Sequence, residues 1–237
     1  MTIAIVDYGM GNLHSVSKAV ERLGYEGLVT GGADAILGAD GVLLPGVGAF
    51  GDAMEHLRAS GLDAVVHQAA ANGTPLLGIC LGMQLLFSES EEHGRNEGLG
   101  ILPGRAVRFG GSGAGSALGA GTDAGEGGIS AGSATGALGA PGGLKVPHMG
   151  WNRLAFLQPD SPLLAGLEEG HVYFVHSYHV LPERREDLLA VTDYGHPVTA
   201  IVGRGNVYGM QFHPEKSGEL GMALLRNFLS LAERDNN

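Results

Sequence analysis

The chain has little cysteine and little positive charge. Only one of its 237 residues is cysteine. This excludes an internal disulfide and a cysteine-rich metal site, and it fits a reducing compartment. Lysine and arginine number 14 against 25 aspartates and glutamates, which gives a formal charge of -11. Such a charge argues against non-specific binding to nucleic acid or to an anionic membrane.

Long apolar runs are also missing. No stretch approaches about 18 uninterrupted apolar residues, so no transmembrane helix is predicted. The start of the chain, M-T-I-A-I-V-D, has neither the basic region nor the apolar run of a signal peptide. The hydrophobic fraction of 44% is ordinary for a globular protein. We therefore expect a cytoplasmic protein with a single domain over residues 1–237.

Short apolar segments alternate with helical patterns in the first half of the chain. Leu13, Val16, Val20 and Leu23 recur at spacings of three and four, which is typical of an amphipathic helix that begins after Asn12 and ends near Gly24. Further helices are predicted over 52–59 and 62–72, and buried strands over 2–6, 25–30, 41–45 and 74–79. This alternation predicts a parallel sheet covered on both faces.

Strands follow one another closely in the second half. We expect them at 105–109, 151–156, 171–177, 178–181, 188–192, 198–202 and 206–212, before a closing helix with Leu224 and Phe228 on its apolar face. Short turns between strands are typical of hairpins. The predicted fold is therefore α/β: an open mixed sheet with a parallel core, helices on both faces and an antiparallel extension.

Residues 110–143 differ from the rest of the domain in composition. Most of them are glycine or alanine and none is aromatic. Such a segment buries too little apolar surface to offset its ordering entropy. We interpret it as a low-complexity insertion that the domain does not need for folding.

The single cysteine, Cys80, lies between two glycines in G-I-C-L-G (78–82), where a buried strand is predicted to meet a helix. This pattern has the form of a nucleophile elbow, in which glycines stand where a Cβ would clash. A thiol at the start of a helix is close to backbone N–H groups that favour the thiolate. A lone cysteine is more often an inert core residue, which would not require the flanking glycines.

A thiolate nucleophile needs a proton donor and acceptor, and an oriented histidine is the usual choice. His213 in H-P-E directly follows a predicted strand and has Glu215 two residues on. In an extended chain both side chains would point to the same side. Metal binding by this pair is the alternative, but no third ligand stands at matching spacing, and no metal is expected.

Two glycine-containing turns also follow predicted strands. P-G-V-G (45–48) could present backbone N–H donors to the negative oxygen of a tetrahedral intermediate. Ligands bind at this edge of open α/β sheets. The earlier turn, D-Y-G-M-G-N (7–12), suggests phosphate binding only weakly, because it lacks the dinucleotide-binding and P-loop patterns.

Taken together and in this order, P-G-V-G, G-I-C-L-G-M-Q and H-P-E resemble the class I (triad) glutamine amidotransferases. Three further segments resemble one branch of that family, the glutaminase subunits of imidazole glycerol phosphate synthase in histidine biosynthesis. These segments are I-V-D-Y-G-M-G-N-L (5–13), K-V-P-H-M-G-W-N (145–152) and Q-F-H-P-E-K-S (211–217). The resemblance covers nearly the whole chain except 110–143.

The resemblance implies a mechanism. Cys80 would attack the side-chain amide of glutamine to form a thioester, His213 would move the protons, and Glu215 would orient His213. The oxyanion would lie against the backbone of Gly46, Val47, Gly48 and Leu81. Substrate glutamine would be held by Gln84, His176, Ser177 and Tyr178.

The resemblance also implies a partner. Ammonia would pass to a (β/α)8-barrel cyclase subunit, which makes imidazole glycerol phosphate and an aminoimidazole carboxamide ribotide. Trp151, Tyr178 and Lys216 would face this subunit in a heterodimer. No cofactor, metal, nucleic acid or membrane is implied.

Rival functions remain open at this point. Glutaminases of anthranilate, guanylate or pyridoxal phosphate synthesis have the same triad. A γ-glutamyl hydrolase would use it without a partner, and a regulatory binding module could keep the fold without catalysis.

Overall fold

A computed structural model describes residues 1–110 and 144–234. Within these ranges, nine strands form one mixed sheet in the order β2-β1-β3-β4-β13-β12-β11-β8-β9. The parallel strands are β1 (Thr2–Val6), β2 (Glu26–Thr30), β3 (Gly41–Gly46), β4 (Leu76–Cys80) and β13 (Val207–Met210). The antiparallel strands are β12 (Pro197–Arg204), β11 (Leu188–Asp193), β8 (His148–Phe156) and β9 (His171–His176). The predicted mixed sheet with a parallel core and an antiparallel extension is confirmed.

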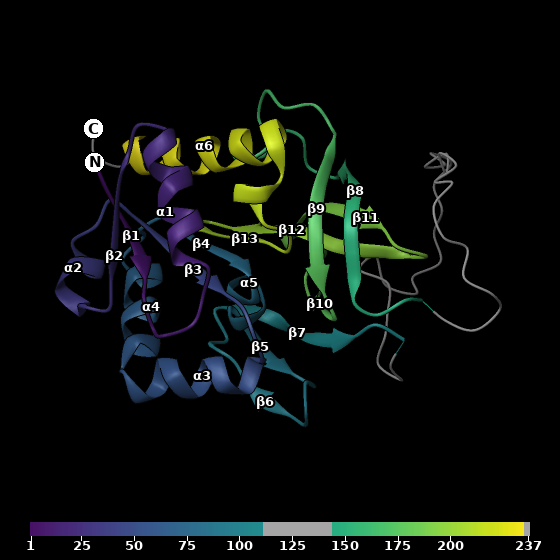
Figure 1. Cartoon of the computed structure of the whole chain (residues 1–237), viewed down its shortest axis with the longest axis horizontal. Helices are drawn as coiled ribbons and strands as arrows, with labels where there is room; N and C mark the ends of the chain where they lie inside the picture. The colour runs from purple at the N-terminus through teal and green to yellow at the C-terminus, as the bar shows by residue number, and fades with distance from the viewer. Residues whose placement is uncertain (111–143, 235–237) are drawn as a thin grey trace.

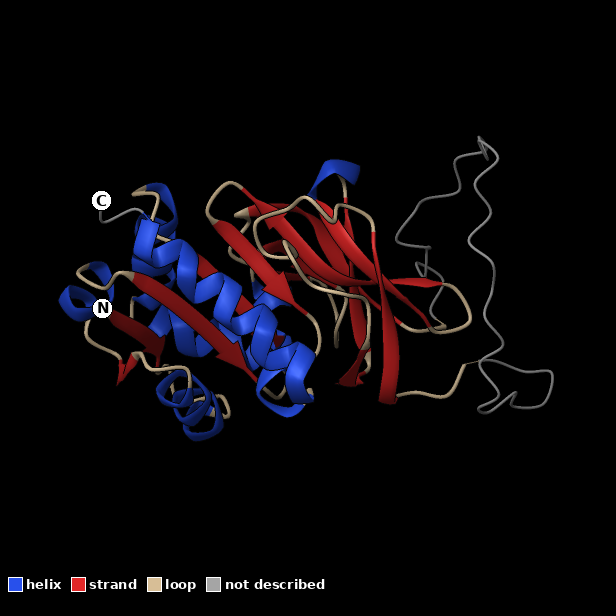
Figure 2. Cartoon of the chain, turned by 90° about the horizontal axis from the view of Figure 1, so that it is seen from above, coloured by secondary structure: helices blue, strands red, loops and turns tan. Residues whose placement is uncertain are grey.

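Helices cover both faces of the parallel half (Figure 1). Helices α1 (Leu13–Arg22) and α6 (Gly218–Arg234) share one apolar cluster with the strands. The other face is covered by α2 (Ala33–Leu37), α3 (Phe50–Ala59) and α4 (Leu62–Ala71), together with the short α5 (Leu81–Leu85). From above, the helices lie over the parallel half, and the antiparallel strands extend away from them (Figure 2). None of the helices in the described ranges is long and apolar enough to cross a membrane.

A second sheet was not predicted. In the described part of the chain it has four strands, in the order β10 (Tyr178–Pro182), β7 (Leu102–Arg108), β5 (Phe87–Ser90) and β6 (Asn96–Glu97). Strands β5 and β6 are short and mostly polar, so they carry no apolar alternation that could reveal them. The predicted strand at 105–109 overlaps β7 over residues 105–108.

Most predicted boundaries agree with the structure to within a few residues. Gly24 follows the end of α1 with a φ of 90°, as expected for a helix stop. Asn12 occupies the N-cap position of α1, but its side chain makes no capping hydrogen bond. The five-residue α2 was not predicted. Two one-turn 3-10 helices, η1 (Arg185–Asp187) and η2 (Pro214–Lys216), complete the elements. The predicted insertion lies, except for Gly110, outside the described residues.

Two glycines allow the turn from β4 into α5 to press against the neighbouring strand. A Cβ on Gly82 would stand 1.7 Å from the carbonyl oxygen of Leu44 in β3. A Cβ on Gly78 would meet the carbonyl oxygen of Gly82 at 2.6 Å. Both contacts are closer than real Cβ atoms allow, and both involve backbone that cannot rotate away. The sequence G-I-C-L-G therefore fixes how closely Cys80 is held to β3.

Replacing Gly82 by alanine should destabilise the fold severely, by more than about 3 kcal/mol, because the new methyl group overlaps backbone. Gly205→Ala is the matched control: φ is +57°, but no described atom lies within 4 Å of the added Cβ. Only backbone strain of about 1 kcal/mol is expected there. Denaturant unfolding measures both, and equal costs would contradict the close approach at Gly82.

Candidate active site

A cavity of about 430 Å³ lies at the carboxyl ends of β3, β4 and β13, which are neighbours in the larger sheet. Open α/β sheets bind ligands at this edge. Each of the three sequence motifs stands at the end of one of these strands or just beyond it, so the topology brings P-G-V-G, Cys80 and H-P-E together. The lining residues are Val47, Gly48, Cys80, Leu81, Gln84, Glu92, Pro147, Val175, His176, Ser177, Tyr178, His213 and Lys216.

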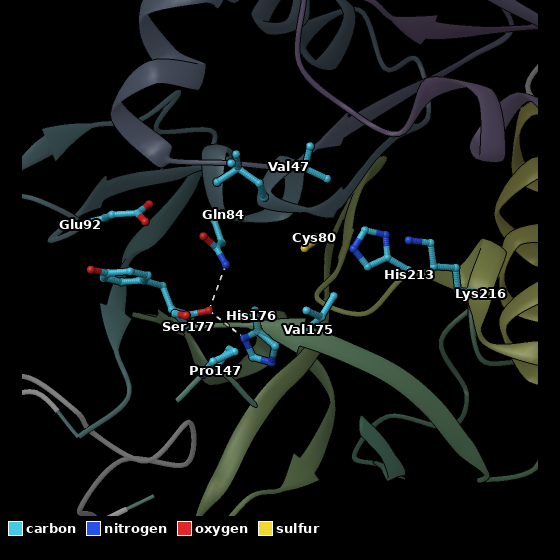
Figure 3. A pocket seen from close by; sticks show the side chains of 13 residues that line it. Val47, Cys80, Gln84, Glu92, Pro147, Val175, His176, Ser177, His213 and Lys216 are labelled. Carbon is cyan, nitrogen blue, oxygen red and sulfur yellow. Dashed lines mark hydrogen bonds between the residues drawn. The ribbon is translucent and has the colours of Figure 1, made fainter. Parts of the chain in front are cut away.

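Cys80 stands on a strained turn. Its φ of 56° and ψ of -112° belong to the first central position of a type II′ turn, which non-glycine residues rarely occupy. The residue is 7% exposed, and its sulfur faces the imidazole of His213 (Figure 3). The predicted tight strand-to-helix turn is confirmed. Since α5 has only five residues, the helix contributes little to the charge state of the sulfur compared with His213.

His213 and Glu215 meet as predicted, but not for the predicted reason. Their side chains are joined by a hydrogen bond of 2.9 Å between His213 Nδ1 and Glu215 Oε1, and both are almost fully buried. The expectation of an extended chain was wrong, because residues 214–216 form the 3-10 helix η2. The Ser217 hydroxyl holds this turn by donating to the carbonyl of His213 (2.7 Å) and accepting from the N–H of Tyr173 (2.9 Å).

The surroundings of His213 favour its protonated form. Burial alone would lower the pKa of His213, but hydrogen bonds to Cys80 and Glu215, together with the negative charges of both, raise it to about 9. At neutral pH the imidazole therefore carries a proton beside the sulfur. A thiolate–imidazolium pair is the form in which such a cysteine is nucleophilic.

The P-G-V-G turn borders the cavity in part. Val47 and Gly48 line it, and Val47 is 41% exposed. Gly48 has a φ of 99°. Gly46 is buried and does not line the cavity; a Cβ there would meet the Tyr8 hydroxyl at 2.7 Å. That hydroxyl donates to the carbonyl of Pro45 (3.0 Å), which fixes the start of the turn.

The four residues predicted to hold substrate all line the cavity. Gln84 comes from α5, and residues 176–178 cross from β9 of the larger sheet to β10 of the smaller one. The carbonyl oxygen of Tyr178 accepts hydrogen bonds from Gln84 Nε2 (3.0 Å) and His176 Nδ1 (2.8 Å) (Figure 3). Burial, reinforced by the neighbouring His148, lowers the pKa of His176 to about 3, so this imidazole is neutral.

The three residues predicted to face a partner do not lie together. Tyr178 and Lys216 line the cavity, whereas Trp151 on β8 stands outside it and is 55% exposed. Met149 on the same strand is 60% exposed. Trp151 is therefore not a core aromatic residue. Large exposed apolar side chains on one strand are typical of an interaction surface.

Several residues at the site were missed by the sequence reasoning. Glu92 lines the cavity and accepts a hydrogen bond of 2.7 Å from the N–H of Phe50. It stands in the polar run S-E-S-E-E-H, where nothing distinguishes it from its neighbours. Pro147 and Val175 also line the cavity. Gln211 is fully buried behind Cys80, and its position directly before F-H-P-E was the available signal.

No group of three metal-ligating side chains that could hold an ion occurs in residues 1–110 or 144–234. The histidines near the site contact aromatic rings or one another instead. His148 stacks on Phe174 with ring centroids 4.7 Å apart, and its Nδ1 lies 2.9 Å from His176 Nε2.

The glutamine amidotransferase class-I family model matches residues 4–232 of the chain. The chain belongs to this family. Among curated proteins, the imidazole glycerol phosphate synthase subunit HisH of Geobacillus kaustophilus (strain HTA426) is 53% identical over 235 residues, which cover 99% of this chain and 99% of that protein. The protein of that name from Bacillus subtilis (strain 168) is 48% identical over 230 residues, which cover 97% of this chain and 96% of that protein.

Solved structures agree on the fold of this amidotransferase. A structure of PurLQS from Thermotoga maritima matches with a TM-score of 0.67 at 19% identity, covering 97% of this chain and 98% of that one. The crystal structure of a putative GMP synthase protein from Thermoplasma acidophilum matches with a TM-score of 0.66 at 18% identity, covering 100% and 96%. These two likenesses concern the fold alone.

Replacing Glu215 by glutamine should lower the pKa of His213, because a charge that stabilises the imidazolium is lost. In the unaltered protein the imidazole should lose its proton as the pH rises through about 9. In the variant this loss should come at lower pH. NMR titration of the imidazole carbon-bound protons measures it, with the exposed Glu219→Gln as control. An unchanged midpoint in Glu215→Gln would show that the carboxylate does not act on His213.

Proposed function

We propose that this amidotransferase is the glutaminase subunit of an imidazole glycerol phosphate synthase, with Cys80, His213 and Glu215 as its catalytic triad. The observation that carries the triad is the buried contact series from Cys80 to His213 to Glu215 in a cavity at the sheet edge. The name shared by relatives about half identical over nearly the full chain supports the assignment to this synthase.

In the first half of the proposed reaction, the Cys80 sulfur attacks the side-chain amide carbon of glutamine. The C–S bond forms, and the C–N bond breaks as the His213 imidazolium gives its proton to the departing nitrogen. The products are ammonia and a glutamyl thioester. In the second half, neutral His213 takes a proton from water, the hydroxide attacks the thioester, and glutamate leaves with the sulfur restored.

Negative charge develops on the carbonyl oxygen in both halves. Backbone N–H groups are the usual stabilisers of such an oxyanion. In this proposal they come from Val47 and Gly48 on one side and from Leu81, the residue after the nucleophile, on the other. Gly46 does not line the cavity. Its role is to let the turn pack closely against the Tyr8 hydroxyl, since a Cβ at this position would collide with it.

The cavity suits a small zwitterion. Its volume of about 430 Å³ lies at the low end of small-ligand sites. The Glu92 carboxylate is the negative group in it and is the candidate partner for the α-ammonium of glutamine. Gln84, Ser177 and Tyr178 supply polar groups around the remaining atoms, and His176 holds the carbonyl of Tyr178 in place.

The proposal includes a (β/α)8-barrel cyclase as partner in a heterodimer. Ammonia released at Cys80 would pass to that subunit, which forms imidazole glycerol phosphate and an aminoimidazole carboxamide ribotide. A protected transfer is chemically reasonable because ammonia in water is mostly protonated and no longer nucleophilic, and closed sites exclude water. The exposed Met149 and Trp151, together with Lys216, are the candidate docking residues. A cytoplasmic location would keep the Cys80 thiol reduced, as this chemistry requires.

Replacing Cys80 by alanine should lower glutamine hydrolysis in the complex by more than about a thousandfold, because the nucleophile is lost. Co-purification with the cyclase should persist, since Cys80 is buried within its own chain. Glutamate release measured by a coupled assay decides the matter. A variant that still hydrolysed glutamine at a comparable rate would remove the triad from the mechanism.

Glutaminase activity should be low when this protein is alone and should rise when the cyclase is added.

Trp151→Ala should weaken the association about tenfold or more, because exposed tryptophans are common anchors of interfaces. Measuring the glutaminase rate while the cyclase is titrated in gives both the degree of activation and the dissociation constant of the complex. Leu28→Ala, an exposed apolar residue of β2, is the matched control. Equal rates with and without cyclase would favour a hydrolase that works alone.

A further inference from the structure

Gln211 lies between the nucleophile and the substrate-binding side of the cavity without lining it. Its side chain is fully buried at the end of β13, two residues before His213. Its Nε2 approaches the Cys80 sulfur at 3.9 Å, and its Oε1 accepts a hydrogen bond of 3.0 Å from Gln84 Nε2. Burying an amide is unfavourable unless both of its ends are satisfied. Here the two partners are residues of the proposed mechanism.

The direction of these hydrogen bonds is set by the backbone. The carbonyl oxygen of Tyr178 can only accept, so Gln84 must turn its Nε2 toward it. The same nitrogen is 3.0 Å from the amide of Gln211, which must therefore present Oε1 to Gln84. The remaining end of Gln211, the Nε2 donor, then points at the sulfur. A reversed Gln211 would place two donors together and lose a buried hydrogen bond.

We infer that Gln211 is a positioning residue that holds an N–H donor on the Cys80 sulfur and thereby favours the thiolate over the thiol. This inference rests on the proposed function, since it assigns a second stabilising contact to the same nucleophile. A hydrogen bond to the charged form of a group favours that form. His213 acts from one side of the sulfur by charge, and Gln211 acts from another side by a neutral donor. The sulfur is thereby fixed in position and cannot rotate freely on its strained turn.

Other titratable groups also face Cys80, and their contributions differ from that of Gln211. His213 hydrogen-bonds the sulfur and carries the charge that Glu215 supports. Tyr8 comes from the turn after β1. Burial, followed by the nearby negative charge of Cys80, raises the pKa of its hydroxyl, so Tyr8 stays neutral. Lys216 and Glu92 line the same cavity. It is Gln211 that links the sulfur, through Gln84, to the carbonyl of Tyr178.

Alkylation of the complex by iodoacetamide tests this inference directly, because Cys80 is the chain's only cysteine. The alkylation rate of this chain, followed by mass spectrometry across pH, reports thiolate whatever the natural substrate is. In Gln211→Met, which keeps the volume and removes the donor, the midpoint of the profile should move up by about one pH unit. In Gln211→Glu, which places an oxygen at the sulfur, the upward shift should be larger.

Two comparisons separate a positioning role from a structural one. Gln68→Glu makes the same chemical change on the exposed face of α4 and should leave the profile in place. In Gln211→Met, kcat for glutamine should fall about tenfold with KM little changed, and the thermal midpoint should stay near that of the unaltered complex. If Gln211→Met does not fold, Gln211→Asn replaces it. This variant keeps a buried amide but withdraws it from the sulfur, and the same upward shift of the alkylation midpoint is expected.

Profiles of the Gln211 variants that coincide with the unaltered protein would overturn the inference. This result is independent of the proposed function, because alkylation requires no glutamine turnover. Conversely, if Cys80→Ala retained glutamine hydrolysis while the Gln211 variants shifted the profile, the proposed function would fail and the hydrogen bond would stand.

Discussion

The site depends on the close contact between the turn at Gly82 and the backbone of β3. No side chain fits between Gly82 and the Leu44 carbonyl, so β4 passes into α5 within one turn. That geometry goes with a positive φ at Cys80 and places this buried residue in the lining of the cavity at the sheet edge. Proteins keep such strained residues where the surrounding structure over-determines them. Here the surroundings are two fully buried central strands, β3 and β4.

The electrostatics of the site follow from where β13 lies. This strand is parallel to β4 and antiparallel to β12, so it stands at the junction of the two halves of the sheet. Gln211 and His213, two residues apart just beyond the carboxyl end of β13, both contact the Cys80 sulfur. The Ser217 hydroxyl and the one-turn η2 then fold Glu215 back onto His213. A buried histidine that would otherwise be neutral is thereby kept protonated at neutral pH.

The sequence predicted the parts that depend on local pattern. Alternating apolar segments predicted the parallel core, and the glycines around Cys80 predicted the tight turn, because both signals lie within a few residues. The smaller sheet could not be predicted, since β5 and β6 are short, polar and paired with distant residues. Glu92 and Gln211 were missed for the same reason: their partners, Phe50, Gln84 and Cys80, are far away in sequence. The contact of His213 with Glu215 was predicted from an extended chain, whereas η2 produces it by a helical turn.

Residues 176–178 cross from the larger sheet to the smaller one, so different sides of the cavity belong to different sheets. Cys80 ends β4 and His213 follows the adjacent β13, so the larger sheet carries both as one body. Tyr178 begins β10 of the smaller sheet and is joined to that body through Gln84 and His176. A small rotation of one sheet against the other would therefore widen or narrow the substrate side while leaving the sulfur–imidazole distance unchanged. Because Gln84 and Gln211 connect Tyr178 to the sulfur, such a movement would also change the donor that Cys80 receives, so the shape of the substrate side and the readiness of the nucleophile are linked in this architecture.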